Sequence, residues 1–300
     1  MGTRNFHELV GARWDEGKFV CIGLDTEFDK VPRHMRRTPI DHALFSFNAP
    51  IVEVVSDYVC AIKLNAAFYE AEGQAGIAAL SATIRLIASI DPGIAVILDV
   101  KRADIGNSSS AYARAAFEEL RADAVTVNPY FGAEALKPFL DRPEKGIFVV
   151  CRTSNEGGSE FQDRIVVPTF DDEKRWGLPS GPRGESEPTH MPLYQYVAYR
   201  VSREWNGKGN CGLVVGATVP EELQKVRGIV GTMPILIPGI GAQGGDLAAT
   251  VAAGKDERGK GMLIHSARQV IYASDGVEYA LAAQKATVGL HEAISRNLAG

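Results

Sequence analysis

Three charged residues of mixed sign follow a strongly apolar stretch of this chain. Residues 94–98 read Ile-Ala-Val-Ile-Leu, and Asp99, Lys101 and Asp104 come directly after them. Short, β-branched apolar runs are typical of buried strands, and residues two apart on a strand project to the same face. We therefore expect Asp99 and Lys101 to lie side by side at the end of a strand. Because buried charges must be paired, this spacing favours a functional site over a solvated strand end.

A further charge, Lys63, lies inside the apolar run at residues 59–64. Lysine is rarely buried without a partner. If residues 59–64 and 94–98 form neighbouring strands, Lys63 meets Asp99 and the charges alternate from Lys63 through Asp99 and Lys101 to Asp104. Such a row perturbs the pKa values of its members, and it could hold an anion while Lys101 offers a proton. A purely structural ion network is the alternative.

A glycine-rich turn at residues 238–245, Pro-Gly-Ile-Gly-Ala-Gln-Gly-Gly, follows the apolar run at 234–238. Glycine lets backbone N–H groups approach an oxygen closely, and the start of a helix favours negative charge. Arg268 follows the last apolar run, at 261–265, and arginine binds phosphate through two parallel hydrogen bonds. Together these features predict a phosphorylated substrate. A simple tight turn is the alternative, because the Lys-Ser/Thr pair of a P-loop is missing.

Apolar runs that resemble strands recur along the chain, and each is followed by a helical pattern. This alternation predicts a single (β/α)8 TIM barrel, with an open, doubly wound sheet as the alternative. The charged and glycine-rich features fall at the carboxyl ends of the strands, where barrels place their active sites. The expected strands are residues 19–24, 59–64, 94–98, 124–127, 146–151, 212–216, 234–238 and 261–265.

The expected helices include an extra one ahead of the first strand, at residues 5–18. The others lie at 41–57, 71–90, 108–121, 133–140 and 192–206, from Pro220 onward, after residue 246, and at 276–297. Residues 159–190 differ, because they are rich in proline, glycine and charge and lack clear periodicity. We predict an irregular excursion there, inserted after the fifth strand and too short for a core of its own. Residues 1–300 are thus expected to form one barrel domain.

Composition excludes several classes of protein. The chain is 45% hydrophobic and 23% charged with a net charge of -5, which gives no global basic field for nucleic acid. No apolar run approaches the roughly 20 residues of a membrane span, and the N-terminus carries no hydrophobic signal region, so we expect a cytoplasmic protein.

The histidines show no metal-binding spacing. The four cysteines are expected to be buried free thiols; they are Cys21, Cys60, Cys151 and Cys211.

The motif Asp99-x-Lys101-x-x-Asp104 resembles the DxKxxD signature of the orotidine 5'-phosphate decarboxylase family. The resemblance covers most of the chain and looks most like a longer bacterial branch, in which insertions lengthen the barrel loops. It extends over residues 23–25, 62–65, 154–155, 215–218, 238–245 and 268–272. It implies a homodimeric barrel that converts orotidine 5'-phosphate to UMP in de novo pyrimidine biosynthesis, with neither metal nor organic cofactor.

The resemblance also implies a role for each charged residue. Asp25 would hydrogen-bond the ribose, and Lys63 would bridge a ribose hydroxyl and Asp99. Asp99 would face the carboxylate of the substrate. Lys101 would protonate C6 of the pyrimidine, the carbon from which this carboxylate is lost. Asp104 would reach into the site of a partner subunit.

The same resemblance assigns the substrate-binding residues. Ile105 and Ser108 would accompany the last aspartate of the motif into the partner's site. Ser154 would contact the edge of the pyrimidine. Gln243 and Arg268 would bind the phosphate.

Two other functions remain open. Magnesium-dependent enzymes of the same superfamily, such as 3-keto-L-gulonate 6-phosphate decarboxylase and hexulose-phosphate synthase, share the DxKxxD motif. They place a carboxylate near the end of the second strand to help hold Mg²⁺, whereas this chain has the cation of Lys63 there. The other alternative is a barrel that only binds nucleotides, which would not require both Lys63 and Lys101.

Overall fold

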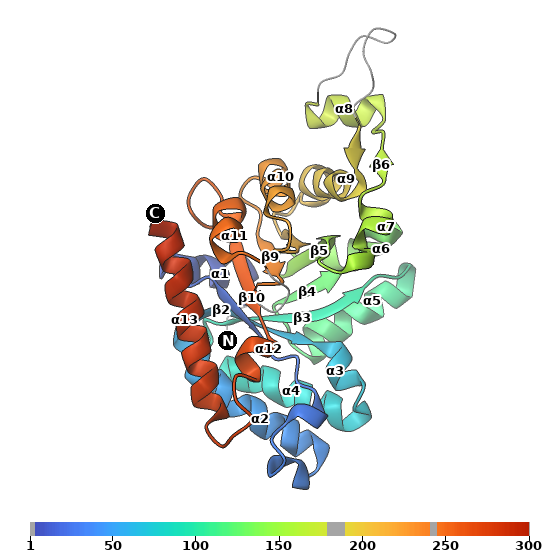
Figure 1. The fold of residues 1–300 in the computed structure, drawn as a ribbon. Coiled ribbons are helices and arrows are strands. Elements are labelled where there is room, and N and C mark those ends of the chain that lie inside the picture. Colours follow the sequence, from blue (N-terminus) through green and yellow to red (C-terminus); the bar gives the residue numbers. More distant parts are fainter. Residues whose placement is uncertain (1–3, 179–189, 241–244, 300) are drawn as a thin grey trace.

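A closed barrel of eight parallel strands forms the centre of the computed structural model, which describes residues 4–178, 190–240 and 245–299 (Figure 1). Strand β1 pairs in parallel with both β2 and β10, which closes the sheet and rules out the open, doubly wound alternative. The predicted barrel is therefore confirmed. Its strands are β1 (Val20–Gly23), β2 (Val59–Asn65), β3 (Ala95–Arg102), β4 (Ala124–Val127), β5 (Gly146–Arg152), β8 (Cys211–Val215), β9 (Ile235–Pro238) and β10 (Met262–Ser266).

The barrel strands are short, β-branched and almost wholly buried. Every residue of β1, β4, β8 and β10 is buried, because one face of each strand fills the barrel interior and the other lies beneath the helices. The four cysteines are buried and free, as predicted.

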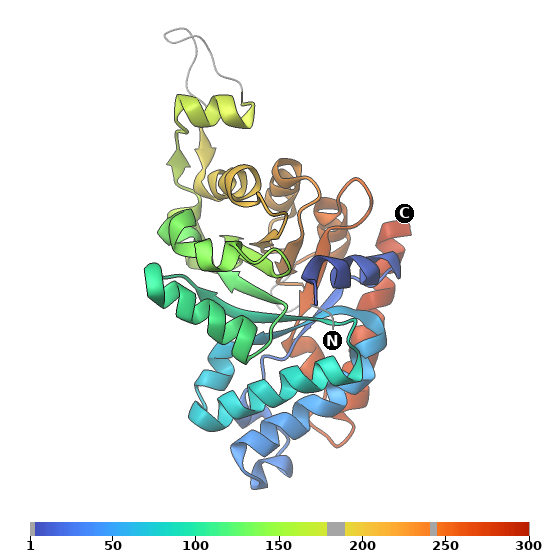
Figure 2. The same cartoon turned by 180° about the vertical axis from the view of Figure 1, so that it is seen from behind.

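The helices lie outside the barrel, and most of them cover the outward faces of the strands (Figures 1 and 2). They are α1 (Phe6–Asp15), α2 (Ile40–Val55), α3 (Ala66–Glu70), α4 (Gly73–Ile90), α5 (Gly106–Arg114), α6 (Gly132–Leu140), α9 (Leu193–Arg200), α10 (Pro220–Val230), α11 (Leu247–Gly254), α12 (Arg268–Ile271) and α13 (Tyr279–Ala299). Two π-helical turns, η4 (Ala115–Glu119) and η7 (Val201–Trp205), extend α5 and α9. The 3-10 turns are η1 (Phe28–Lys30), η2 (Met35–Arg37), η3 (Ser56–Tyr58), η5 (Pro129–Phe131) and η6 (Glu156–Gly158).

The extra helix predicted ahead of the barrel is α1, and it covers the amino-terminal end of the strands. The ring of Phe6 packs edge-on against Phe148 of β5, with the ring centroids 5.5 Å apart. Trp14 donates a hydrogen bond of 2.8 Å from Nε1 to the carbonyl of Met262 at the start of β10. The opposite, carboxyl end of the barrel is left for the functional loops.

One helix of the described residues, α4, is long and apolar enough to cross a membrane by length and composition alone. No such segment was expected from the sequence. A core helix of a soluble protein meets the same criteria, and α4 buries one face, with Leu80, Ile84 and Ile87, against the rest of the fold. The length of α4 therefore decides nothing about membranes.

The segment after β5 is more ordered than the predicted irregular excursion. It contains α7 (Ser159–Gln162), α8 (Phe170–Trp176) and the antiparallel pair β6 (Ile165–Val166) and β7 (Met191–Pro192). Figures 1 and 2 show β6, β7 and α8 projecting beyond α9. The prediction of irregular structure is therefore wrong for the described part of this segment.

Local capping and aromatic packing order this excursion. Thr169 and Asp172 form a reciprocal capping box at the start of α8, a Thr-x-x-Asp signal that marks a helix start in the sequence. At the other end of α8, Trp176 stacks on Tyr199 of α9 with the ring centroids 5.4 Å apart. The stacking partner is distant in sequence, which explains why periodicity within the segment did not reveal the helix.

Candidate active site

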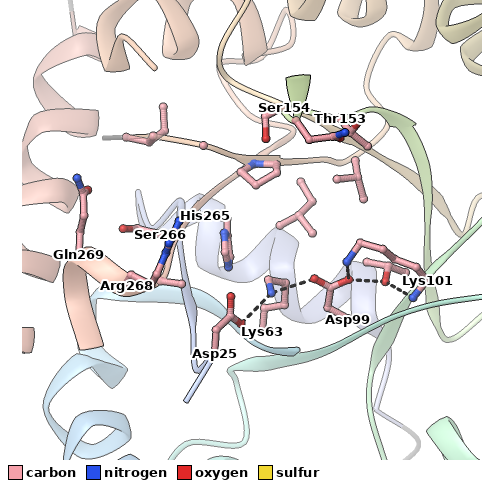
Figure 3. Close-up of a pocket in the computed structure, with 18 residues that line it drawn as sticks. Asp25, Lys63, Asp99, Lys101, Thr153, Ser154, His265, Ser266, Arg268 and Gln269 are labelled. Carbon is pink, nitrogen blue, oxygen red and sulfur yellow. Dashed lines mark hydrogen bonds and ion pairs between the residues drawn. The ribbon is translucent and has the colours of Figure 1, made fainter. Parts of the chain in front are cut away.

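The carboxyl ends of the barrel strands enclose a cavity of about 320 Å³ (Figure 3). Its polar lining comes from the segments that follow β1, β5 and β10 and from residues within β2, β3, β4 and β10. The polar side chains are Asp25, Lys63, Asp99, Lys101, Thr126, Thr153, Ser154, Asn155, His265, Ser266, Arg268 and Gln269. Most of the predicted site residues thus meet in one place.

Lys63 lies between two carboxylates at the floor of this cavity. Strand pairing sets Lys63 of β2 opposite Gly23 of β1, so Asp25, just beyond β1, comes within reach. The Nζ atom of Lys63 lies 3.2 Å from Oδ1 of Asp25 and 3.1 Å from Oδ2 of Asp99, and its side chain is 4% exposed. The lysine that the sequence predicted to be buried and paired is therefore paired twice.

The buried charges stabilise one another. Burial alone lowers the pKa of Lys63, but the charges of Asp25 and Asp99 outweigh burial and raise that pKa above its usual value. Burial raises the pKa of Asp99, but the charges of Lys63 and Lys101, with hydrogen bonds from Lys101 and Thr126, hold it well below its usual range. Lys63 and Asp99 are thus both charged at neutral pH.

Lys101 contacts the other oxygen of Asp99. Its Nζ lies 2.7 Å from Oδ1 of Asp99, while half of the Lys101 side chain stays exposed. The two side chains meet, as expected, but not through the regular alternation of a strand. The register of β3 against β4 breaks between Leu98 and Arg102, and Lys101 adopts a left-handed backbone with φ 46°. Lys101 and Asp99 therefore meet because of a bulge in β3, not because of the regular pleat of the strand.

The row of charges ends at Lys101 within one chain. Asp104 makes no ion pair with the described residues; its Oδ1 accepts a hydrogen bond of 2.8 Å from the backbone N–H of Ile105. Asp104, Ile105 and Ser108 do not line the cavity, and Ile105 is 64% exposed. The predicted alternation of charges from Lys63 to Asp104 therefore stops at Lys101 among the described residues of one chain, and the placement of Asp104 in a partner's site stays a prediction.

The loop that carries Ser154 is fixed from two sides. Gly216 packs directly against Ser154, so closely that a Cβ at residue 216 would lie 2.9 Å from the Ser154 Cβ. Gln162 of α7 accepts a hydrogen bond of 2.9 Å from the backbone N–H of Thr153, and its side-chain amide donates to the Thr153 hydroxyl over 2.8 Å. Ser154 therefore faces the cavity from a rigid loop.

Arg268 lies at the start of α12, on the side of the cavity opposite Lys101 (Figure 3). The side chain is exposed, and the described residues offer it no hydrogen bond or ion pair. This arginine is available to bind an anion at the cavity mouth. Gln243, the other residue expected at this end, lies outside the described residues.

Several lining residues were not singled out as site residues from the sequence, and Thr126 and His265 are the two that contact or border the charged cluster. Thr126 lies among β-branched residues of β4, where threonine looks like ordinary strand packing. His265 is buried at the end of β10, and burial together with the charge of Lys63 lowers its pKa to about 3. Its Nε2 atom is buried without a hydrogen-bond partner among the described residues. The imidazole is therefore neutral, and only the fold reveals that it borders the charged cluster.

Comparison with known proteins gives one consistent result. The model of the "Orotidine 5'-phosphate decarboxylase / HUMPS family" matches residues 20–283. The chain is 42% identical over 295 residues to the orotidine 5'-phosphate decarboxylase of Azoarcus sp. (strain BH72), covering 97% of this chain and 98% of that one. It is 44% identical over 295 residues to the protein of the same name from Cupriavidus metallidurans, with the same coverage of 97% and 98%.

Solved structures agree with the sequence relatives. The OMP decarboxylase of Leishmania donovani superposes with a TM-score of 0.79 at 35% identity, covering 99% of both chains. The UMP synthase of the same organism superposes with a TM-score of 0.80 at 37% identity, covering 99% of this chain and 57% of that one. These alignments cover almost the whole of this chain.

Proposed function

The chain belongs to the orotidine 5'-phosphate decarboxylase / HUMPS family, and on that premise we propose that it is a carboxy-lyase that converts orotidine 5'-phosphate to UMP in pyrimidine biosynthesis. The observation that carries this function is the buried charge cluster. Lys101 Nζ lies 2.7 Å from Asp99, which in turn lies 3.1 Å from Lys63. The cluster offers both a fixed carboxylate and a fixed ammonium group to the reacting carbon.

Lys101 is the proton donor in this proposal. The bond between C6 of the pyrimidine and its carboxyl carbon breaks, carbon dioxide leaves, and the electron pair stays on C6. The ammonium group of Lys101 stabilises this developing negative charge and then transfers its proton to C6. Solvent returns a proton to the neutral amine, since the Lys101 side chain is half exposed.

Asp99 has two roles. It holds Lys101 through the contact of 2.7 Å, and it remains ionised beside the carboxylate of the substrate. Two like charges in a desolvated cavity repel each other, and the repulsion ends when the substrate carboxylate leaves as neutral carbon dioxide. Binding energy from the distant phosphate offsets this repulsion in the bound substrate.

The rest of the substrate spans the cavity. Asp25 and Lys63 hydrogen-bond the ribose hydroxyls, and Ser154 contacts the pyrimidine edge. Arg268, without a partner among the described residues, binds the phosphate together with Gln243. The separation of Arg268 from Lys101 in Figure 3 supports this orientation.

The reaction proposed here requires no metal or organic cofactor. Lys63 Nζ lies between Asp25 and Asp99 and already neutralises the carboxylates that would otherwise attract a divalent cation. A fixed ammonium group at this place repels Mg²⁺. This charge favours the decarboxylase over the magnesium-dependent enzymes of the superfamily.

We also propose that the protein is a homodimer in which Asp104, Ile105 and Ser108 enter the partner's site. The loops after β3 and β4 are neighbours at the carboxyl end of the barrel. They expose large apolar side chains: Ile105 is 64% exposed, Tyr130 88% and Phe131 51%. Apolar patches of this kind mark protein interfaces. We further propose that the enzyme is cytoplasmic and has no nucleic-acid or membrane partner. Its net charge of -5 provides no basic field that would attract nucleic acid or an anionic membrane surface.

The test of this function is the decrease in pyrimidine absorbance when purified protein is added to orotidine 5'-phosphate. We expect turnover to UMP and carbon dioxide. Binding without turnover would favour a nucleotide-binding barrel. Turnover of 3-keto-L-gulonate 6-phosphate with added Mg²⁺, and none of orotidine 5'-phosphate, would assign the chain to the sugar-phosphate enzymes.

A further inference from the structure

Strand β3 contains a bulge at the centre of the site. Leu98 pairs with Val125 of β4, and Arg102 pairs with Val127. Residues 99–101 of β3 therefore lie opposite a single residue of β4, Thr126. An insertion of this size removes backbone groups from their ladder hydrogen bonds and leaves them in need of other partners.

The side chain of Thr126 supplies those partners. Its Oγ1 accepts hydrogen bonds from the backbone N–H groups of Val100, at 3.0 Å, and Lys101, at 2.9 Å. The same hydroxyl donates to Oδ1 of Asp99 over 2.7 Å. The directions are fixed, because a backbone N–H can only donate and an ionised carboxylate can only accept.

These three bonds use the full capacity of a hydroxyl group, which has one donor and two acceptor positions. Thr126 is 1% exposed. The hydroxyl therefore has nothing left to offer a substrate, although the residue lines the cavity. Its influence on the reaction must pass through Asp99 and Lys101.

Lys101 needs such support. Its backbone is left-handed, with φ 46°, a conformation that non-glycine residues adopt only where their surroundings enforce it. In that conformation its Nζ lies 2.7 Å from Oδ1 of Asp99. Asp99 Oδ1 accepts from both the Thr126 hydroxyl and Lys101 Nζ, so one oxygen links the bulge to the ammonium group.

We propose that Thr126 is a positioning residue of the decarboxylation reaction, and that its hydroxyl group holds the β3 bulge so that Lys101 Nζ and the Asp99 carboxylate keep their reactive arrangement. The inference rests on the proposed function. It adds a residue of β4 that touches neither the phosphate end of the site nor the reacting carbon, and it explains how a regular barrel strand carries two catalytic residues so close together.

Two matched variants test the role of the hydroxyl. Thr126→Val keeps the shape of the side chain but removes all three hydrogen bonds, whereas Thr126→Ser keeps the hydroxyl and removes a methyl group. We expect Thr126→Val to lower kcat by about 10²-fold, the effect that misplacement by about 1 Å produces, with the affinity for UMP unchanged. We expect Thr126→Ser to retain kcat close to that of the wild type.

The pH dependence of kcat/KM separates loss of the hydroxyl group from loss of side-chain packing, because packing alone does not change the pKa of Asp99. The Thr126 hydroxyl stabilises ionised Asp99, so its removal raises the pKa of Asp99. The acid limb of kcat/KM should then move to higher pH in Thr126→Val and stay in place in Thr126→Ser. Equal losses of kcat in both variants, or wild-type kcat in Thr126→Val, would overturn the proposal.

A crystal structure of Thr126→Val decides the inference independently of activity. We expect the backbone of Lys101 to leave the left-handed region and Nζ to separate from Asp99; an unchanged bulge would overturn the proposal. If the wild type fails to decarboxylate orotidine 5'-phosphate, the proposed function is wrong, while this structural result still decides whether Thr126 holds the bulge. Should Thr126→Val not fold, Thr126→Ala removes the same hydroxyl and carries the same expectations.

Discussion

The Nζ atom of Lys63 lies 3.1 Å from Oδ2 of Asp99 on the neighbouring strand, and both side chains are almost completely buried. A buried ion pair is weak evidence for stability, because desolvation of the two charges offsets their attraction. In this site the ion pair serves to position Asp99. Lys63 fixes the orientation of Asp99, and Asp99 presents its other oxygen to Lys101 at 2.7 Å.

The first prediction concerns the proton donor. Lys101→Ala should lower kcat by about 10²–10⁴-fold or more, the range associated with loss of a positioned general acid. The affinity for UMP should stay close to the wild-type value, because Arg268 lies at the other end of the cavity. Steady-state kinetics and calorimetric titration of UMP measure the two effects. Lys137→Ala, at an exposed lysine of α6, is the control. Parallel losses of kcat and UMP affinity would mean that Lys101 mainly binds.

The second prediction concerns metal ions. Activity on orotidine 5'-phosphate should survive exhaustive treatment with EDTA and should not rise on addition of Mg²⁺. The reason is the ammonium group of Lys63, placed between two carboxylates at 3.2 and 3.1 Å. Activity that disappears with the chelator and returns with Mg²⁺ would contradict the proposed mechanism.

The third prediction concerns the shared site. Asp104→Ala and Lys101→Ala should each be inactive alone. When the two variants exchange subunits, each mixed dimer contains one site with both residues intact, so about one quarter of the wild-type activity should return. Subunit exchange is verified by mass spectrometry of the intact dimers. Verified exchange without recovered activity would show that Asp104 does not act in the partner's site.

The fourth prediction concerns stability in acid. Burial and the charge of Lys63 lower the pKa of His265 from its usual 6.5 to about 3. The unfolded chain therefore binds a proton at this residue that the folded chain does not. The stabilisation is present above pH 6.5 and is lost as the pH falls toward 3, by about 1.4 kcal/mol per pH unit.

Urea unfolding at pH 7, 6 and 5 measures this effect. The free energy of unfolding should fall less steeply with acidification in His265→Gln than in the wild type. His34→Gln, at an exposed histidine, should keep the wild-type slope. Identical slopes for His265→Gln and the wild type would show that folding does not lower the pKa of His265.

The barrel could be predicted because each of its strands is a local feature of the sequence. Residues 59–64, 124–127 and 234–238 are short apolar runs, and their lengths and positions match β2, β4 and β9 closely. The excursion could not be predicted in the same way. Its helix α8 is stabilised by Tyr199 and Arg200 of α9, which are distant in sequence.

Some features of the active site could likewise be predicted from the sequence, and others could not. The sequence determined the residue types, their order, and their place at the carboxyl ends of strands, because apolar runs and charged residues are visible in the chain itself. Which of these charges are in contact depends on the three-dimensional fold. Strand pairing placed Lys63 between Asp25 and Asp99, and a bulge held by Thr126 brought Lys101 to Asp99. Residue spacing along one strand specifies a face, but the distance between two side chains depends on the register with the neighbouring strand.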